Sequence, residues 1–95
     1  MDGNFEWDLG KADQNLRKHG VGFDEAATAF ADPLSVTVPD PRHSQAEQRY
    51  VLFGISERGR LLAVMHVERG STIRIISSRL VTPRERREYQ EGQED

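Results

Sequence analysis

The sequence predicts an α+β domain in which two N-terminal helices and one C-terminal helix pack on an antiparallel β-sheet. Two segments with helical periodicity come first, a run of segments rich in β-forming residues follows, and a strong helix-start signal stands near the C-terminus. A chain of 95 residues without cysteine suits a small core with no disulfide bonds. We therefore expect residues 1–95 to form one domain.

The N-terminal third of the chain carries a short strand and the first two helices. Phe5–Trp7 alternates between apolar and polar residues, as a strand does. Asp8 is a suitable N-cap for a helix over Leu9–His19, and the glycine that follows this segment is a suitable end. A second helix is expected over Phe23–Ala31, where apolar residues recur at spacings of three and four.

The rest of the chain predicts a sheet followed by a helix. Strands are expected over Leu34–Val38, Arg49–Ser56, Leu61–Val67 and Thr72–Ser77. The polar segment Pro39–Gln48 is expected to be a functional or mobile loop. A last helix is expected over Pro83–Gln90, because Thr82 and Glu85 have the spacing of a capping box around a proline in the first helical position.

The hairpin formed by the last two expected strands carries the predicted polar site. If its loop is Arg69–Ser71, then His66 lies opposite Arg74 and forms a polar cluster with Arg74 and Glu68 on one face. The other face would be apolar and covered by the helices; it would carry Ala63, Met65, Val67, Ile73 and Ile75. A register slip of one residue would destroy this pattern. A solvated edge with ordinary salt bridges is the alternative interpretation.

Charge is strongly segregated along the chain. The net charge is −5 over residues 1–41, +6 over residues 42–87 and −4 over residues 88–95, and every Lys or Arg after His19 is an arginine. Arginine suits phosphate and carboxylate, so the middle segment can meet a nucleic acid or an acidic protein, or can simply confer solubility. No apolar run has membrane-spanning length and the N-terminus does not resemble a signal peptide, so we expect a cytoplasmic protein.

The residues present exclude several kinds of chemistry. The three histidines do not have the spacing of a zinc site, and no phosphate-binding glycine loop is present, so no metal and no cofactor is expected. Acid–base cleavage of an RNA phosphodiester remains possible. It needs a base, an acid and cations that stabilise the developing charge. Groups of these types are available: Lys18, His19, His66 and Glu68 can transfer protons, and Arg60, Arg74 and Arg79 can hold a phosphate.

Five segments together resemble the BrnT family of toxins. They are FEWD at 5–8, NLRKHGV at 15–21, FDEAATAFADP at 23–33, ERGRLLAVMHVERG at 57–70 and IRIISSR at 73–79. The resemblance extends from Phe5 to about Tyr89. It implies a RelE-like α+β fold, endoribonuclease activity and neutralisation by a BrnA-type antitoxin with a ribbon-helix-helix part. DNA would then be bound only indirectly, through the antitoxin, in an operator-repressing complex.

The family motifs also suggest site residues. Lys18 and His19 occupy the KHG positions, although helix capping alone also explains these two residues. The expected catalytic residues are Lys18, His19, His66, Glu68, Arg74 and Arg79, and the expected RNA-binding residues are Lys11, Arg58, Arg60 and Arg84. The alternative function is a non-catalytic interaction module whose Arg-rich face binds an acidic partner or joins an operator-repressing complex.

Overall fold

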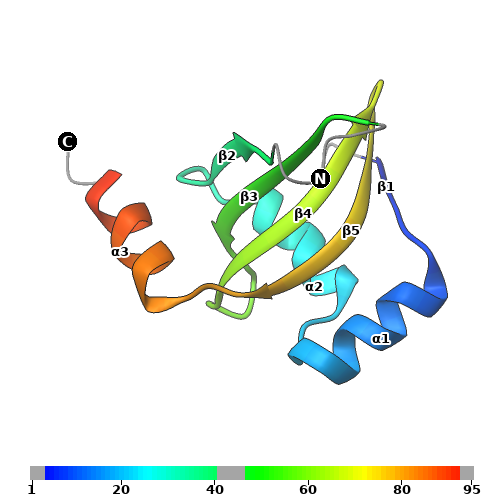
Figure 1. Cartoon of the computed structure of the whole chain (residues 1–95), viewed down its shortest axis with the longest axis horizontal. Coiled ribbons are helices and arrows are strands. Elements are labelled where there is room, and N and C mark those ends of the chain that lie inside the picture. Colours follow the sequence, from blue (N-terminus) through cyan, green and yellow to red (C-terminus); the bar gives the residue numbers. More distant parts are fainter. Residues whose placement is uncertain (1–3, 41–46, 93–95) are drawn as a thin grey trace.

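The computed structural model describes residues 4–40 and 47–92, and these form a five-stranded sheet with three α-helices (Figure 1). The elements are β1 (Asn4–Glu6), α1 (Leu9–His19), α2 (Phe23–Thr28), a 3-10 helix (Ala29–Ala31), β2 (Val36–Pro39), β3 (Arg49–Ile55), β4 (Leu61–Arg69), β5 (Thr72–Leu80) and α3 (Pro83–Gly92). Most of the expected loop over Pro39–Gln48 lies outside the described residues. No helix in the described ranges is long and apolar enough to span a membrane.

The α+β class is confirmed, but the sheet is mixed rather than antiparallel. Its strand order is β1-β5-β4-β3-β2, and β1 runs parallel to β5, with Asn4 paired to Thr72 and Glu6 paired to Arg74. A parallel pair needs a long crossover, which the intervening helices and strands supply here. Strand β2 begins at Val36, two residues later than expected, because the Asp32 side chain accepts the Leu34 N–H at 2.9 Å and holds a turn there.

The hydrophobic core lies between the sheet and the first two helices. Its buried members are Val21, Phe23, Ala26, Ala27, Ala29, Leu52, Leu62, Val64 and Ile75. We call the opposite side of the sheet, which carries Ala63, Met65 and Val67, the open face. The expectation that the helices cover Met65 and Val67 is therefore wrong, because these residues lie on the other side of β4 from Leu62 and Val64.

The register of the β4–β5 hairpin differs by one residue from the expected one. Arg69 pairs with Thr72, so the loop has only two residues, Gly70 and Ser71, and Gly70 adopts a φ of 61°. A two-residue loop of this kind requires positive φ, which glycine reaches without strain. As a result, His66 pairs with Ile75 instead of Arg74.

A β-bulge follows directly and changes which residues of β5 face outward. His66 pairs with Ile75 but Met65 pairs with Ser77, so Ile76 is an extra residue on β5. Between the hairpin loop and the bulge, Arg74 pairs with Val67. On the other side of the bulge, Arg79 pairs with Ala63. The bulge therefore places Arg74, Ser77 and Arg79 together on the open face, whereas strict alternation would have turned Ser77 and Arg79 toward the helices.

Candidate active site

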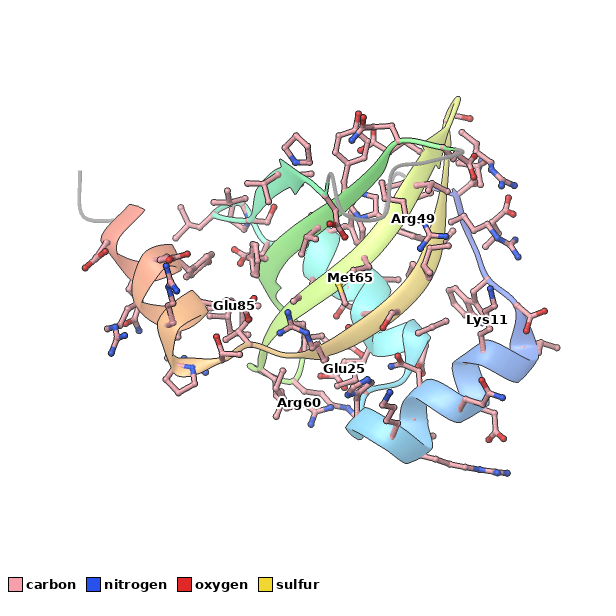
Figure 2. All side chains as sticks on the ribbon, in the orientation of Figure 1. Lys11, Glu25, Arg49, Arg60, Met65 and Glu85 are labelled. Carbon is pink, nitrogen blue, oxygen red and sulfur yellow. The ribbon has the colours of Figure 1, made fainter. Side chains whose placement is uncertain are left out.

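A hollow between α1 and β5 brings three of the predicted site residues together. Its volume is about 270 Å³, and it is lined by Lys11, Gln14, Asn15, Lys18, His19, Ile76 and Ser77. We call it the α1–β5 hollow. Figure 2 shows Lys11 on the helix that forms one wall. Ser77 belongs both to the hollow and to the open face, so the two surfaces are continuous.

The sequence of α1 explains how the basic residues reach the hollow. Lys11 and Lys18 are seven residues apart, which is about two helical turns, so both project from the same flank. Asp8 caps the helix by accepting the Lys11 N–H at 2.9 Å. Gly20, with a φ of 71°, ends the helix in the left-handed conformation, so Lys18 and His19 occupy the last turn, which favours cations. In this position, the two side chains stabilise the end of the helix and also line the hollow.

Asn15 anchors α1 to β5 and was missed as a site residue. The residue is only 7% exposed; Nδ2 donates to the carbonyl of Ser78 at 2.8 Å, and Oδ1 accepts the Ser78 N–H at 3.1 Å. The amide thus satisfies both backbone groups of Ser78, as a neighbouring strand would. Oδ1 also accepts from Ser77 Oγ at 3.3 Å. Asn15 is therefore a positioning residue. In the sequence, it is marked only by its place between Lys11 and Lys18 on one flank of the helix.

Arginines on the open face are held by carboxylates. Arg74 Nη1 lies 2.7 Å from Glu6 Oε2. Arg79 forms a bidentate pair with Glu85, with distances of 2.8 and 3.0 Å. These two cations lie on either side of Ser77 along β5, and the carboxylate paired with each one fixes its orientation.

Glu85 links this surface to the start of α3. The predicted capping box is confirmed, since Glu85 Oε1 accepts the Thr82 N–H at 2.9 Å and Thr82 Oγ1 accepts the Glu85 N–H at 3.1 Å. The hydrogen bonds from Arg79, reinforced by those of Thr82, lower the pKa of Glu85 from 4.5 to about 2 against the opposing effect of burial. The pair therefore clamps α3 to β5 while Glu85 is ionised.

This clamp predicts a defined loss of stability in acid. Because the pKa of Glu85 is lower in the folded than in the unfolded chain, its contribution is complete above pH 4.5 and is lost as the pH falls toward 2. Acid should lower the unfolding free energy of the wild type, and up to about 3 kcal/mol of this decrease should be absent in Glu85→Gln. Urea denaturation of both proteins at several pH values measures the difference. Glu88→Gln, whose exposed pair with Arg84 is weak, should leave the decrease unchanged. A wild-type pH dependence in Glu85→Gln would contradict the prediction.

The predicted cluster of His66, Glu68 and Arg74 is wrong. His66 is fully buried on the helix side of the sheet, and its ring centroid lies 4.9 Å from that of Phe30. Arg74 lies on the open face, because its neighbour Ile75 is the residue that pairs with His66. Glu68 keeps only a contact of 3.5 Å between its Oε2 and His66 Nε2. A fully buried imidazole cannot contact RNA in this structure.

The structure places the other predicted RNA-binding arginines outside the hollow. Arg60 is bound internally: its Nε donates to Glu25 at 2.9 Å and its Nη2 donates to the Gly20 carbonyl at 3.0 Å. Arg58 is exposed in the turn between β3 and β4, and Arg84 is exposed on α3. None of the three lines the hollow, so a contact of Arg58 or Arg84 with RNA stays a prediction.

Comparisons with known proteins identify the family. The family of the ribonuclease toxin BrnT, of type II toxin–antitoxin systems, matches residues 7–85. The fold is similar to the crystal structure of the Brucella abortus ribonuclease toxin BrnT, with a TM-score of 0.66 and 23% sequence identity over 84% of this chain and 97% of that one. A search of curated proteins found no match. Since the family match covers most of the sequence, this chain belongs to the BrnT family of ribonuclease toxins of type II toxin–antitoxin systems.

Proposed function

We propose that the chain is a metal-independent endoribonuclease that cleaves RNA at the α1–β5 hollow. The observation that carries this proposal is that Lys11, Lys18 and His19 line one hollow together with Ser77, which lies between Arg74 and Arg79 along β5. Phosphodiester cleavage without a metal needs this combination of a proton-transfer group and fixed cations around one small space.

The proposed reaction is an attack of the ribose 2′-oxygen on the adjacent phosphorus. The bond from O2′ to phosphorus forms while the bond from phosphorus to O5′ breaks, which leaves a 2′,3′-cyclic phosphate and a 5′-hydroxyl. His19 accepts the proton of the 2′-hydroxyl, and a lysine ammonium donates a proton to the leaving oxygen. Lys11 and Lys18 stabilise the charge on the phosphorane. Arg74 and Arg79 bind the neighbouring phosphates by exchanging the carboxylates of Glu6 and Glu85 for them.

The partner that neutralises the toxin is proposed to be a BrnA-type antitoxin. A type II system pairs the toxin with a protein antitoxin, which supports this part of the proposal. The ribbon-helix-helix part of the antitoxin would bind the operator, so the toxin would meet DNA only within the complex. We place both proteins in the cytoplasm, where their RNA and DNA targets lie.

RNA incubated with purified protein in EDTA tests the proposed reaction. We expect cleavage to continue, with 2′,3′-cyclic phosphate and 5′-hydroxyl ends on the products. Cleavage that stops in EDTA and returns with Mg²⁺ would overturn metal independence. Tight RNA binding without cleavage in either buffer would overturn the enzyme and favour the interaction module, in which the Arg-rich face only binds a partner.

A further inference from the structure

Strand β2 lies at one edge of the sheet. Among the residues that the structure describes, it pairs only with β3, and the Asp40 N–H donates to the Arg49 carbonyl at 2.8 Å. Because hydrogen-bonded pairs alternate along an antiparallel ladder, the backbone groups of Val38 point toward β3 and those of Thr37 point outward. Pro39 occupies another outward position, where its missing N–H costs no ladder bond. Thr37 thus presents an N–H and a carbonyl that find no partner among the described residues.

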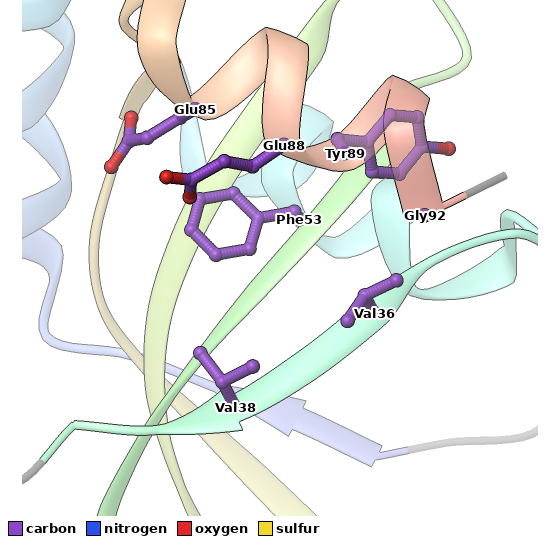
Figure 3. A pocket seen from close by; sticks show the side chains of 7 residues that line it. All are labelled: Val36, Val38, Phe53, Glu85, Glu88, Tyr89 and Gly92. Atoms are coloured by element: carbon purple, nitrogen blue, oxygen red, sulfur yellow. The ribbon is translucent and has the colours of Figure 1, made fainter.

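An apolar groove lies beside this edge, between α3 and the sheet (Figure 3). Its volume is about 180 Å³, and it is lined by Val36, Val38, Phe53, Glu85, Glu88, Tyr89 and Gly92. We call it the α3–β2 groove. Val36 and Val38 remain 40% and 39% exposed, and α3 has no buried residue. An outer strand edge next to exposed valines can pair with a strand of another chain.

The charge of the α3–β2 groove indicates what fits it. Its two charged lining residues are both acidic, Glu85 and Glu88, and Figure 3 shows both on the α3 side above Phe53. Glu85 is neutralised by Arg79, whereas Glu88 is 63% exposed and has only the weak pair with Arg84, which is 82% exposed. The groove therefore favours an apolar side chain flanked by a lysine or arginine.

We propose that the antitoxin adds a strand to the outer edge of β2, inserts an apolar side chain into the α3–β2 groove and places a basic side chain beside Glu88. This inference rests on the proposed function for the identity of the partner. Main-chain bonds to Thr37 would supply affinity, and side chains at every second position would supply specificity. RNA is disfavoured by the acidic rim. A second copy of this chain is disfavoured because Val36–Pro39 carries no basic residue and Asp40 follows it.

Calorimetric titration with purified antitoxin tests the proposed interface. Thr37→Pro removes the outward N–H without removing a bond to β3, and Glu88→Lys reverses the charge at the groove. We expect each change to weaken binding about tenfold. Glu91→Lys is the matched control, because it changes the net charge equally on the same helix but outside the groove lining, and should change the dissociation constant less than twofold. Circular dichroism melts verify the fold of each variant.

The outcomes separate this inference from the proposed reaction. Wild-type affinity in both groove variants, or an equal loss in Glu91→Lys, would overturn the interface. Self-association of the wild type that Thr37→Pro abolishes, with antitoxin binding unchanged, would assign the edge to a second copy instead. RNA cleavage by free Thr37→Pro should match the wild type. Antitoxin binding as expected without any cleavage would overturn the reaction and leave the interface standing.

Discussion

Replacing Lys18 or His19 by alanine is expected to slow RNA cleavage by about 10²-fold or more. Both side chains line the α1–β5 hollow, where His19 would take the proton of the 2′-hydroxyl and Lys18 would stabilise the phosphorane. A positioned proton-transfer group contributes roughly 10²–10⁴-fold, and one fixed donor to a developing charge contributes roughly 10²–10³-fold. Single-turnover rates with toxin in excess measure this effect on the chemical step without a contribution from product release.

Arg17→Ala provides the matched control for this experiment. Arg17 precedes Lys18 on the same helix and carries the same charge, but it is 78% exposed and pairs with Asp13 at 2.9 Å outside the hollow lining. We expect its removal to change the rate less than about threefold, since only long-range attraction of RNA is lost. Equal losses in Arg17→Ala and Lys18→Ala would show that α1 acts through its net charge, and would contradict a reaction in the hollow.

Glu25→Ala is expected to lower the unfolding free energy by about 3 kcal/mol or more. Glu25 is only 4% exposed and binds Arg60 through both carboxylate oxygens, while Ser56 Oγ donates to it at 2.7 Å. The hydrogen bond from Arg60 is the main reason that the pKa of Glu25 is lowered despite burial. Truncation leaves the hydroxyl and the guanidinium without their acceptor. Breaking a buried pair costs about 3–5 kcal/mol, and the lower end of this range is expected here because the Arg60 side chain is 34% exposed.

Urea denaturation at pH 7 measures the loss. The control is Asp24→Ala, which removes a neighbouring but exposed acid from the first turn of α2 and should cost less than about 1 kcal/mol. Similar losses in the two variants would show that water already solvates the pair of Glu25 and Arg60. Because Arg60 also holds the carbonyl of Gly20, Glu25→Ala should loosen the end of α1 that carries His19 as well.

Local signals in the sequence determined the class of fold, most elements and the family. Asp8 and Gly20 mark both ends of α1, and the capping box of Thr82 and Glu85 starts α3, because such contacts join residues within one helical turn. Helical periodicity likewise placed Lys11 and Lys18 on one flank of α1. These interactions are short in sequence, so the residues themselves specify them before any tertiary contact forms.

The tertiary structure alone decided which polar residues come together. The two-residue loop at Gly70 shifts the register by one position, which separates His66 from Arg74. The bulge at Ile76 then returns Ser77 and Arg79 to the open face. Side chains alternate with a period of two, so one residue of slip reverses every face, and composition alone cannot distinguish the two registers. The bond from Asn15 to Ser78 spans 63 positions, and only the packing of α1 on β5 brings its ends together.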